Sequence, residues 1–216
     1  MNFLTTSPKG SLDQLISKFD RALRVVSGQA ISRRNYPGHD LPDGNLSEQE
    51  KSHSAGLMRV NHVGEICAQA LYDSQGANAH TEEIRQQFEH SGIEEEDHLA
   101  WTAKRLHELN SHTSFLNPLW YAGAYACGTI AARFGDAVSL GFVVETEKQV
   151  EAHLASHMKN LPTEDQRSRA VVEQMRLDEI AHGDAAQALG ASTLPAPVQA
   201  GMKLMAKVMT TTAYYI

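Results

Sequence analysis

Two pairs of acidic and imidazole side chains in this sequence are spaced like ligands of one metal site. Glutamate and histidine stand three residues apart at Glu95/His98 and again at Glu179/His182. In an α-helix, residues i and i+3 lie on one face, so each pair aims a carboxylate and an imidazole at the same point. Such oxygen and nitrogen donors suit iron or manganese better than zinc, which favours thiolates or three histidines. The pairs therefore predict binding of iron or manganese.

A single Glu-x-x-His pair carries little weight, because sixteen Glu and eleven His in 216 positions produce about one by chance. A third pair, Glu50/His53, stands among polar residues at a predicted helix start, where we expect it to be solvated. The other two pairs are each preceded by a further glutamate, 30 or 32 residues earlier. Four-helix di-metal carboxylate bundles take one Glu from each of two helices and a Glu-x-x-His from each of the other two. The predicted ligands are Glu65, Glu95, His98, Glu147, Glu179 and His182.

The surroundings of Glu147 support this interpretation. Glu147 stands in the middle of an apolar helix face that includes Val143 and Leu154. A carboxylate there is costly unless it binds a cation or finds a partner. Glu151, one turn further on, is a candidate hydrogen-bonded neighbour of Glu147. Taken alone, the acidic run 94–97 would be an exposed charged segment, and the conjunction of all six residues in the right order is what favours a metal site.

Three further residues are candidates for roles around the metals. Ligating imidazoles normally donate their second N–H to an acid, and Asp97 and Asp178 are the acids available beside the histidine pairs. His62 stands one helical turn before Glu65 and is a ligand, a partner of a ligand or a structural histidine. Sequence position alone does not assign these three.

The elements that must position these residues are predicted to be helices. Apolar residues from Leu12 to Val26 recur at helical spacing, with Gly28 as a stop, and strand-like alternation is missing from the sequence. Capping boxes start helices at Ser47, with Glu50, and at Thr163, with Gln166, while Thr81 caps a third. The expected helices cover residues 47–79, 81–109, 145–161, 163–190 and 198–209. We expect an all-α, ferritin-like four-helix bundle with additional apolar helices.

The chain is expected to form an N-terminal extension over 1–46, with a short helix and a connector, and a bundle over 47–216. The net charge is −7, but residues 1–38 hold six basic and two acidic side chains, whereas residues 39–110 hold five and fourteen. An acidic middle suits a cation site and argues against a nucleic-acid partner. Cys67 and Cys127 form no C-x-x-C pair, which disfavours a disulfide framework and a thiolate-bound cluster.

Two apolar segments, 115–132 and 198–209, indicate contact with a membrane surface. The first is interrupted by Asn117 and Pro118 and followed by Arg133, so it suits an interfacial helix better than a spanning one. In the second, Lys203 and Lys207 would meet lipid headgroups. The alternative is a pair of buried core helices. The first fourteen residues lack the apolar stretch of a secretory signal. We therefore expect peripheral attachment at the cytoplasmic face of the cell membrane.

Four motifs resemble those of the demethoxyubiquinone hydroxylase family, which are membrane-associated di-iron enzymes of ubiquinone biosynthesis. They are RVNHVGE (59–65), EEEDH (94–98), VVETEKQVEAH (143–153) and RLDEIAH (176–182). The likeness extends from about residue 50 to the C-terminus and includes NPLWYAGAYACG, similar to an apolar segment of the family. It implies that the six predicted ligands hold two iron ions per chain. It also implies that the enzyme is a monooxygenase that uses O₂ to hydroxylate a demethoxy polyprenyl benzoquinol.

The electron donor is left open as NADH, a reductase or the quinol itself, since the sequence lacks a nucleotide-binding fingerprint. Other ubiquinone-biosynthesis proteins are possible partners. Two alternatives to the hydroxylase remain: a ferritin-like or rubrerythrin-like protein that handles iron or peroxide, and a metal-free helical bundle that acts as a membrane adaptor. Metal analysis distinguishes the metal-free bundle from the two iron-binding alternatives.

Overall fold

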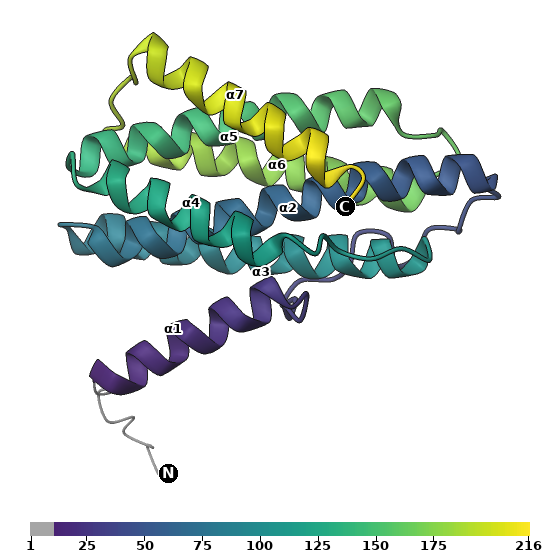
Figure 1. Ribbon diagram of the computed structural model, residues 1–216, viewed down its shortest axis with the longest axis horizontal. Helices are drawn as coiled ribbons and strands as arrows, with labels where there is room; N and C mark the ends of the chain where they lie inside the picture. The colour runs from purple at the N-terminus through teal and green to yellow at the C-terminus, as the bar shows by residue number, and fades with distance from the viewer. Residues whose placement is uncertain (1–10) are drawn as a thin grey trace.

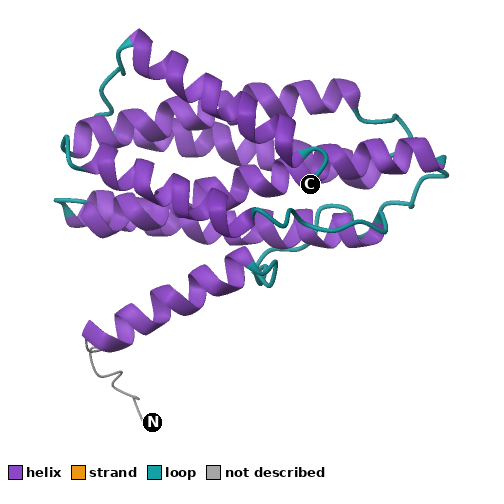
Figure 2. Cartoon of the chain, in the orientation of Figure 1, coloured by secondary structure: helices purple, strands orange, loops and turns teal. Residues whose placement is uncertain are grey.

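The computed structural model describes residues 11–216, and within them every regular element is a helix (Figures 1 and 2). The all-α prediction is confirmed for this range, and residues 1–10 of the expected extension lie outside it. The helices are α1 (Ser11–Val26), α2 (Glu48–Asn78), α3 (Glu82–Glu108), α4 (Asn117–Ala132), α5 (Asp136–Asn160), α6 (Gln166–Ala188) and α7 (Ala196–Ala213). No described helix combines the length and the apolar character needed to cross a bilayer.

The four helices that carry the predicted ligands form the bundle, with α2 packed along α3 and α5 packed along α6. Each ligand position lies between two buried apolar clusters. On α2, Met58 and Tyr72 belong to different clusters and stand seven residues before and after Glu65. The same spacing places Leu140 and Leu154 around Glu147 on α5, and Val172 and Ala186 around Glu179 on α6. Seven residues are two helical turns, so the ligands form a polar layer between two apolar layers.

These layers also give the direction of each helix. Met58 precedes Glu65 on α2, whereas Trp101, in the same cluster, follows Glu95 on α3. Leu154 likewise follows Glu147 on α5, so α3 and α5 run in the same direction. Two consecutive bundle helices with one direction need a connection that returns along the bundle, and α4 is that connection (Figure 1). A single such crossover is the arrangement of ferritin-like bundles.

Local signals explain where most helices begin and end. The Ser47 hydroxyl accepts from Glu50 N, and the Glu50 carboxylate accepts from Ser47 N at 2.9 Å, which confirms the predicted capping box. Thr81 caps α3 as expected. The predicted box at Thr163 is wrong, because Asp165 is the cap of α6 and accepts from Ser168 N at 3.1 Å. Buried pairing of Asp165 with Arg105 fixes the chain at this position.

Two further expectations change in the structure. The helix expected over 145–161 begins earlier, at Asp136, directly after Gly135, whose φ of 98° is a left-handed conformation that suits glycine and separates α4 from α5. The Glu50/His53 pair is half-buried and hydrogen-bonded instead of solvated. Glu50 serves the capping box, and the His53 ring lies 2.7 Å from the Tyr214 hydroxyl. The pair therefore has local structural roles and stands apart from the polar layer.

The segment before α2 packs against the bundle. Tyr36 and Leu46, from the connector between α1 and α2, are buried in the same apolar cluster as Trp101. Arg21 of α1 donates to the Gly92 carbonyl at 2.7 Å and pairs with Glu96 at 2.6 Å, both on α3. In Figure 1, α1 extends away from the bundle below α3. The connector thus covers the outer face of α3, one of the two helices with a Glu-x-x-His pair.

Replacing Arg105 by methionine should destabilise the fold by about 3–5 kcal/mol. The Arg105 side chain is fully buried and donates to Asp165 at 2.8 Å and to Ser168 at 2.9 Å, which ties α3 to the start of α6. Methionine retains the apolar stem but leaves the buried Asp165 carboxylate without its cation. Chemical denaturation measures the change in free energy of unfolding.

The matched control is Arg85→Met on the same helix, which removes an exposed ion pair with Glu82. Exposed pairs contribute little, so we expect this variant to unfold close to wild type. Equal unfolding free energies for the two variants would show that the buried pair does not hold α3 to α6.

Candidate metal centre

All six predicted ligands converge inside the bundle and are at most 3% exposed. Two overlapping sets have ligand atoms within 4.8 Å of one another. The first set is Glu65, Glu95, His98 and Glu179, and the second is Glu95, Glu147, Glu179 and His182. Each set has one histidine and one glutamate of its own, and both sets share Glu95 and Glu179. The geometry is therefore that of two adjacent cation sites joined by two common carboxylates.

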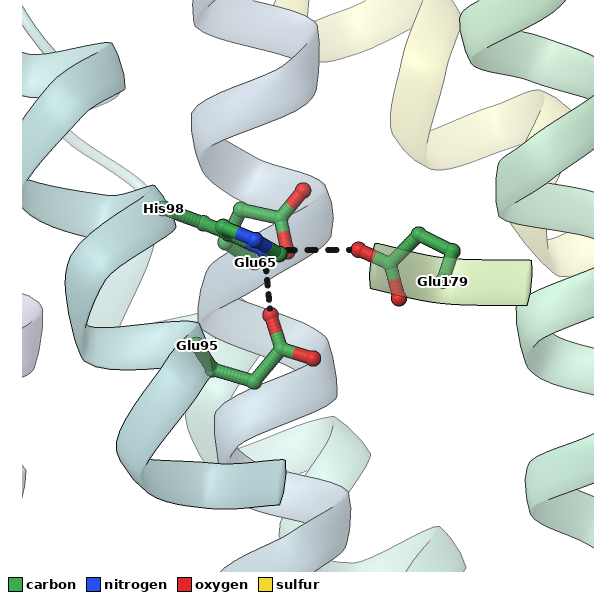
Figure 3. A group of neighbouring side chains, drawn as sticks. All are labelled: Glu65, Glu95, His98 and Glu179. Carbon is green, nitrogen blue, oxygen red and sulfur yellow. Dashed lines mark hydrogen bonds and ion pairs between the residues drawn. The ribbon is translucent and has the colours of Figure 1, made fainter. Parts of the chain in front are cut away.

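Each of the two shared carboxylates directs one oxygen towards His98 and the other oxygen towards His182. Glu95 Oε2 lies 3.1 Å from His98 Nδ1, and Glu95 Oε1 lies 3.3 Å from His182 Nδ1. Glu179 places Oε1 at 3.4 Å from His98 Nδ1 and Oε2 at 3.4 Å from His182 Nδ1. Figure 3 shows Glu65, Glu95 and Glu179 grouped around the His98 ring. A carboxylate that faces two donors in this way can bridge two metal ions.

The inner surface of the site is short of positive partners. Both oxygens of Glu65 and of Glu179, and one oxygen each of Glu95 and Glu147, are buried without a hydrogen-bond partner. Burial and then repulsion from Glu95 and Glu179 raise the pKa of Glu65 well above its usual range. Burial and the same two neighbours raise the pKa of Glu147. Unpaired buried carboxylates are unfavourable, so two divalent cations fit this donor set.

The histidines partly compensate these charges by binding protons. Burial alone would lower the pKa of His98 and His182, but hydrogen bonds to surrounding carboxylates raise both well above the ordinary value. Burial opposes ionisation of Glu95 and Glu179, yet the two histidines beside them lower the pKa of both. In each protonated imidazole, Nδ1 carries the proton at the place where it would bind a metal. Metal binding must therefore release protons and strengthen as the pH rises.

The outer ring nitrogens of both histidines are held by acids from the opposite helix. His98 Nε2, on α3, lies 2.9 Å from Asp178 Oδ2 on α6, and His182 Nε2, on α6, lies 2.8 Å from Glu94 Oε2 on α3. Each acid stands immediately before the Glu of its own Glu-x-x-His pair. Of the two candidate acids that the sequence left unassigned, Asp178 has this role. The Asp97 carboxylate instead accepts from Ser32 and from the backbone of Arg33 in the connector.

Sequence reasoning missed Glu94 and Tyr72. Sequence analysis gives Glu94 no role of its own, although it precedes Glu95 just as Asp178 precedes Glu179. Tyr72 is buried seven residues after Glu65, on the same helix face, and its hydroxyl donates to Glu147 Oε1 at 2.6 Å. This bond satisfies one oxygen of Glu147 and leaves the other directed into the site. The signal for Tyr72 in the sequence was its position seven residues after Glu65, which places both residues on one helix face.

The structure corrects the expected role of Glu151 and decides between the three roles left open for His62. Glu151 pairs with Arg176 at 3.1 Å instead of with Glu147. His62 belongs to neither ligand set. It is fully buried, both ring nitrogens lack hydrogen-bond partners, and burial lowers its pKa to about 4. His62 is therefore a neutral core residue in this structure.

A cavity of about 730 Å³ connects the site to the surface. Its lining is mostly apolar and comes from α2, α4, α5 and α7, with Glu65 at its inner end. Trp120, Ala124 and Cys127 contribute from α4, and the exposed Met205 and Lys207 of α7 lie at its outer part. Of the two ligand sets, the one that contains Glu65 faces this cavity. An apolar molecule with a long tail fits such a space beside a cation site.

Comparison with known proteins identifies the family. Residues 52–213 match the family described as ubiquinone biosynthesis protein COQ7. The chain belongs to this family. A 3-demethoxyubiquinol 3-hydroxylase from Herbaspirillum seropedicae is 65% identical over 205 residues, 95% of this chain and 99% of the relative. A relative with the same name from Herminiimonas arsenicoxydans is 64% identical, and the alignment covers 94% of this chain and 97% of the relative. Another from Cupriavidus pinatubonensis is 57% identical, and the alignment covers 95% of this chain and 100% of the relative.

The COQ7 family match contains all six predicted ligands and begins after the connector. The alignments with the three named relatives cover 94–95% of this chain, so they include most of the N-terminal extension as well. The resemblance deduced from four short motifs is thereby confirmed over nearly the whole chain.

Replacing a shared carboxylate should remove more metal than replacing an unshared one. We expect Glu179→Gln to abolish binding of both ions, because Glu179 belongs to both ligand sets, whereas Glu65→Gln should retain about one ion per chain. Anaerobic titration with Fe(II), followed by metal analysis of the desalted protein, measures the stoichiometry.

The control is Glu50→Gln, in the third Glu-x-x-His pair, which should bind as much metal as wild type. If Glu179→Gln and Glu65→Gln lose equal amounts of metal, the two sets do not share carboxylates as the structure indicates.

Proposed function

We propose that the chain is a 3-demethoxyubiquinol 3-hydroxylase, an O₂-dependent oxidoreductase of ubiquinone biosynthesis. The observation that carries this proposal is the apolar cavity that ends at Glu65 beside a doubled Glu/His site. A ferritin-like or rubrerythrin-like protein that handles iron or peroxide does not need a cavity of this size for an apolar ligand. Close relatives that bear the hydroxylase name over their whole length support the same conclusion.

The proposed metal ligands are the six predicted residues, with two iron ions per chain. Glu95 and Glu179 would contribute to both sites, Glu65 and His98 would complete one site, and Glu147 and His182 would complete the other. Iron is favoured by a donor set of four carboxylates and two imidazoles. When bound, such a pair supplies electrons to O₂ and so permits insertion of one oxygen atom into an aromatic ring.

The chain's own groups prepare this chemistry. Asp178 and Glu94 fix the two imidazole rings with Nδ1 directed inward. Tyr72 holds Glu147 through one oxygen and thereby orients the other. The apolar walls of the cavity exclude water and place a benzoquinol ring at Glu65, while its polyprenyl tail extends between α4 and α7 towards the surface. The protein thus positions the ring for the reaction.

The outer surfaces of α4 and α7 support attachment to an anionic membrane. Large apolar side chains are exposed along both helices, including Leu119 on α4 and Leu204 on α7, each more than 60% accessible. Helix α4 has no charged residue, and α7 has two lysines and no acid. Exposed lysines among apolar residues favour a negatively charged bilayer surface. A polyprenyl quinol dissolved in that bilayer would enter the cavity directly.

The electron donor is proposed to be NADH, a reductase or the quinol.

Functional replacement tests the proposed activity. A bacterial strain blocked at demethoxyubiquinone should regain ubiquinone when it expresses this chain, and Glu179→Ala should abolish the recovery. Quinone extraction and chromatography measure the two quinones. If the wild-type chain folds and binds iron in that strain without forming ubiquinone, the substrate assignment is wrong.

In the same assay, a matched pair of glycine variants tests the cavity. Gly123 on α4 lines the cavity, whereas Gly201 on α7 does not, and a side chain added at either position meets open space. We expect Gly123→Trp to accumulate demethoxyubiquinone at normal iron content and Gly201→Trp to behave as wild type. Equal quinone ratios in the two strains would argue against this cavity as the substrate site.

Charge reversal on α7 should weaken membrane binding. The double variant Lys203→Glu/Lys207→Glu places repulsive charges beside the exposed apolar residues, and each lysine near an anionic surface contributes about 1 kcal/mol. We expect its partition coefficient on vesicles with anionic phospholipid to fall by at least tenfold at low salt, measured by sedimentation. The control, Lys148→Glu/Lys159→Glu, makes the same charge change on exposed positions of α5. Equal loss in both would refute a specific role for α7.

A further inference from the structure

The connector between α1 and α2 places one cation against the acids that hold the metal-binding histidines. Arg34 Nε donates to Asp97 Oδ2 at 2.7 Å, and Arg34 NH1 lies 2.9 Å from Asp178 Oδ2. The same nitrogen lies 4.0 Å from Glu94 Oε1. Asp178 and Glu94 are the two carboxylates that accept from His98 and His182. A single guanidinium therefore faces both outer acids of the site.

Several neighbouring contacts hold Arg34 in this position. Its guanidinium lies over the Trp101 ring, 4.7 Å from the centroid, and the Trp101 indole N–H donates to Ser32 Oγ. Ser32 Oγ and Arg33 N both reach Asp97 Oδ1, at 3.0 and 2.5 Å. Asp97 is 2% exposed, so it anchors the turn at residues 32–34 through several bonds. The turn thus has its own attachment, and the contact of Arg34 with Asp178 is additional to it.

We propose that Arg34 is a positioning residue that sets the electron donation of His98 to its metal, acting through Asp178. The inference rests on the proposed di-iron function. Asp178 Oδ2 receives both His98 Nε2 and Arg34 NH1, while Gln174 donates to Asp178 Oδ1 at 2.9 Å. A carboxylate paired with a guanidinium is a weaker acceptor for the imidazole N–H, so the imidazole donates less charge to a metal.

The sign of the effect follows from electrostatics. A positive charge near the metals, and a weaker donor imidazole, both favour the reduced state of the iron pair over the oxidised one. Arg34 should therefore raise the reduction potential of the pair. Arg34 precedes the part of the chain that matches the COQ7 family, which begins at residue 52. The N-terminal extension would then tune a metal centre whose ligands all lie outside it.

Potentiometric titration of the iron-loaded full chain tests the proposal. The protein is loaded anaerobically with two equivalents of Fe(II), and the mixed-valent state is followed by electron paramagnetic resonance. We expect Arg34→Gln to lower the midpoint potential. The shift should correspond to an oxidised-to-reduced ratio about three to ten times higher at a fixed potential. This factor lies below the tenfold to hundredfold changes in metal affinity or activity that are typical of removing a partner bonded directly to a metal ligand. Arg34→Lys keeps the charge and should restore most of the potential.

Two controls separate this role from general effects of charge and packing. Arg33→Gln removes the same charge from the neighbouring residue, which is exposed and 4.0 Å from Glu96. Ser32→Ala loosens the turn but keeps the Arg34 side chain. Both variants should retain the wild-type potential, whatever their thermal stability.

The inference is overturned if Arg34→Gln shifts the potential no more than Arg33→Gln, or if Ser32→Ala shifts it as much. A wild-type chain that binds no iron overturns the proposed metal centre and the inference together. A wild-type chain that binds two ions, with equal potentials in all variants, overturns only the role of Arg34.

Discussion

The structure depends on four carboxylates that are brought together in the interior of an apolar bundle. Burial penalises their charges, and their mutual repulsion adds to this penalty. Two imidazoles provide partial compensation within the layer, and hydrogen bonds from Tyr72 to Glu147 and from His98 to Glu95 fix single oxygens. The apolar clusters two helical turns away on either side supply the stability that this polar layer lacks. Two divalent cations would neutralise the carboxylates, so metal binding and folding of the bundle centre are thermodynamically linked.

The two sides of the site have different tasks. On the α3–α6 side, Asp178 and Glu94 cross between the helices and hold the imidazoles, and Arg34 of the connector joins these acids. On the other side, α2 and α5 form the inner walls of the apolar cavity. Charged groups therefore hold the two histidines on the α3–α6 side, while the apolar cavity lies on the α2–α5 side. This separation keeps the polar support away from the space in which a ring would bind.

The topology of the bundle explains the cavity. Because α3 and α5 run in the same direction, the chain must return along the bundle between them, and α4 makes this return. Its sequence contains no charge, so one face can pack on α2 while another remains exposed and apolar. Together with α7 it forms the outer walls of the cavity. A connection that the topology requires thus becomes the wall through which an apolar substrate would pass.

The sequence by itself determined the helical class and the six acidic and imidazole residues that converge in the bundle, because positions three, four and seven residues apart lie on one helix face regardless of packing. It also named Asp178 and Asp97 as candidate acids for the histidines, without deciding between them. Only the tertiary structure decided that Glu95 and Glu179 are shared and that Glu94, instead of Asp97, holds the second imidazole. It alone decided that Arg34 faces these acids. Helical periodicity fixes the direction of a side chain from its own axis, whereas these pairings depend on which helix lies opposite and at what height.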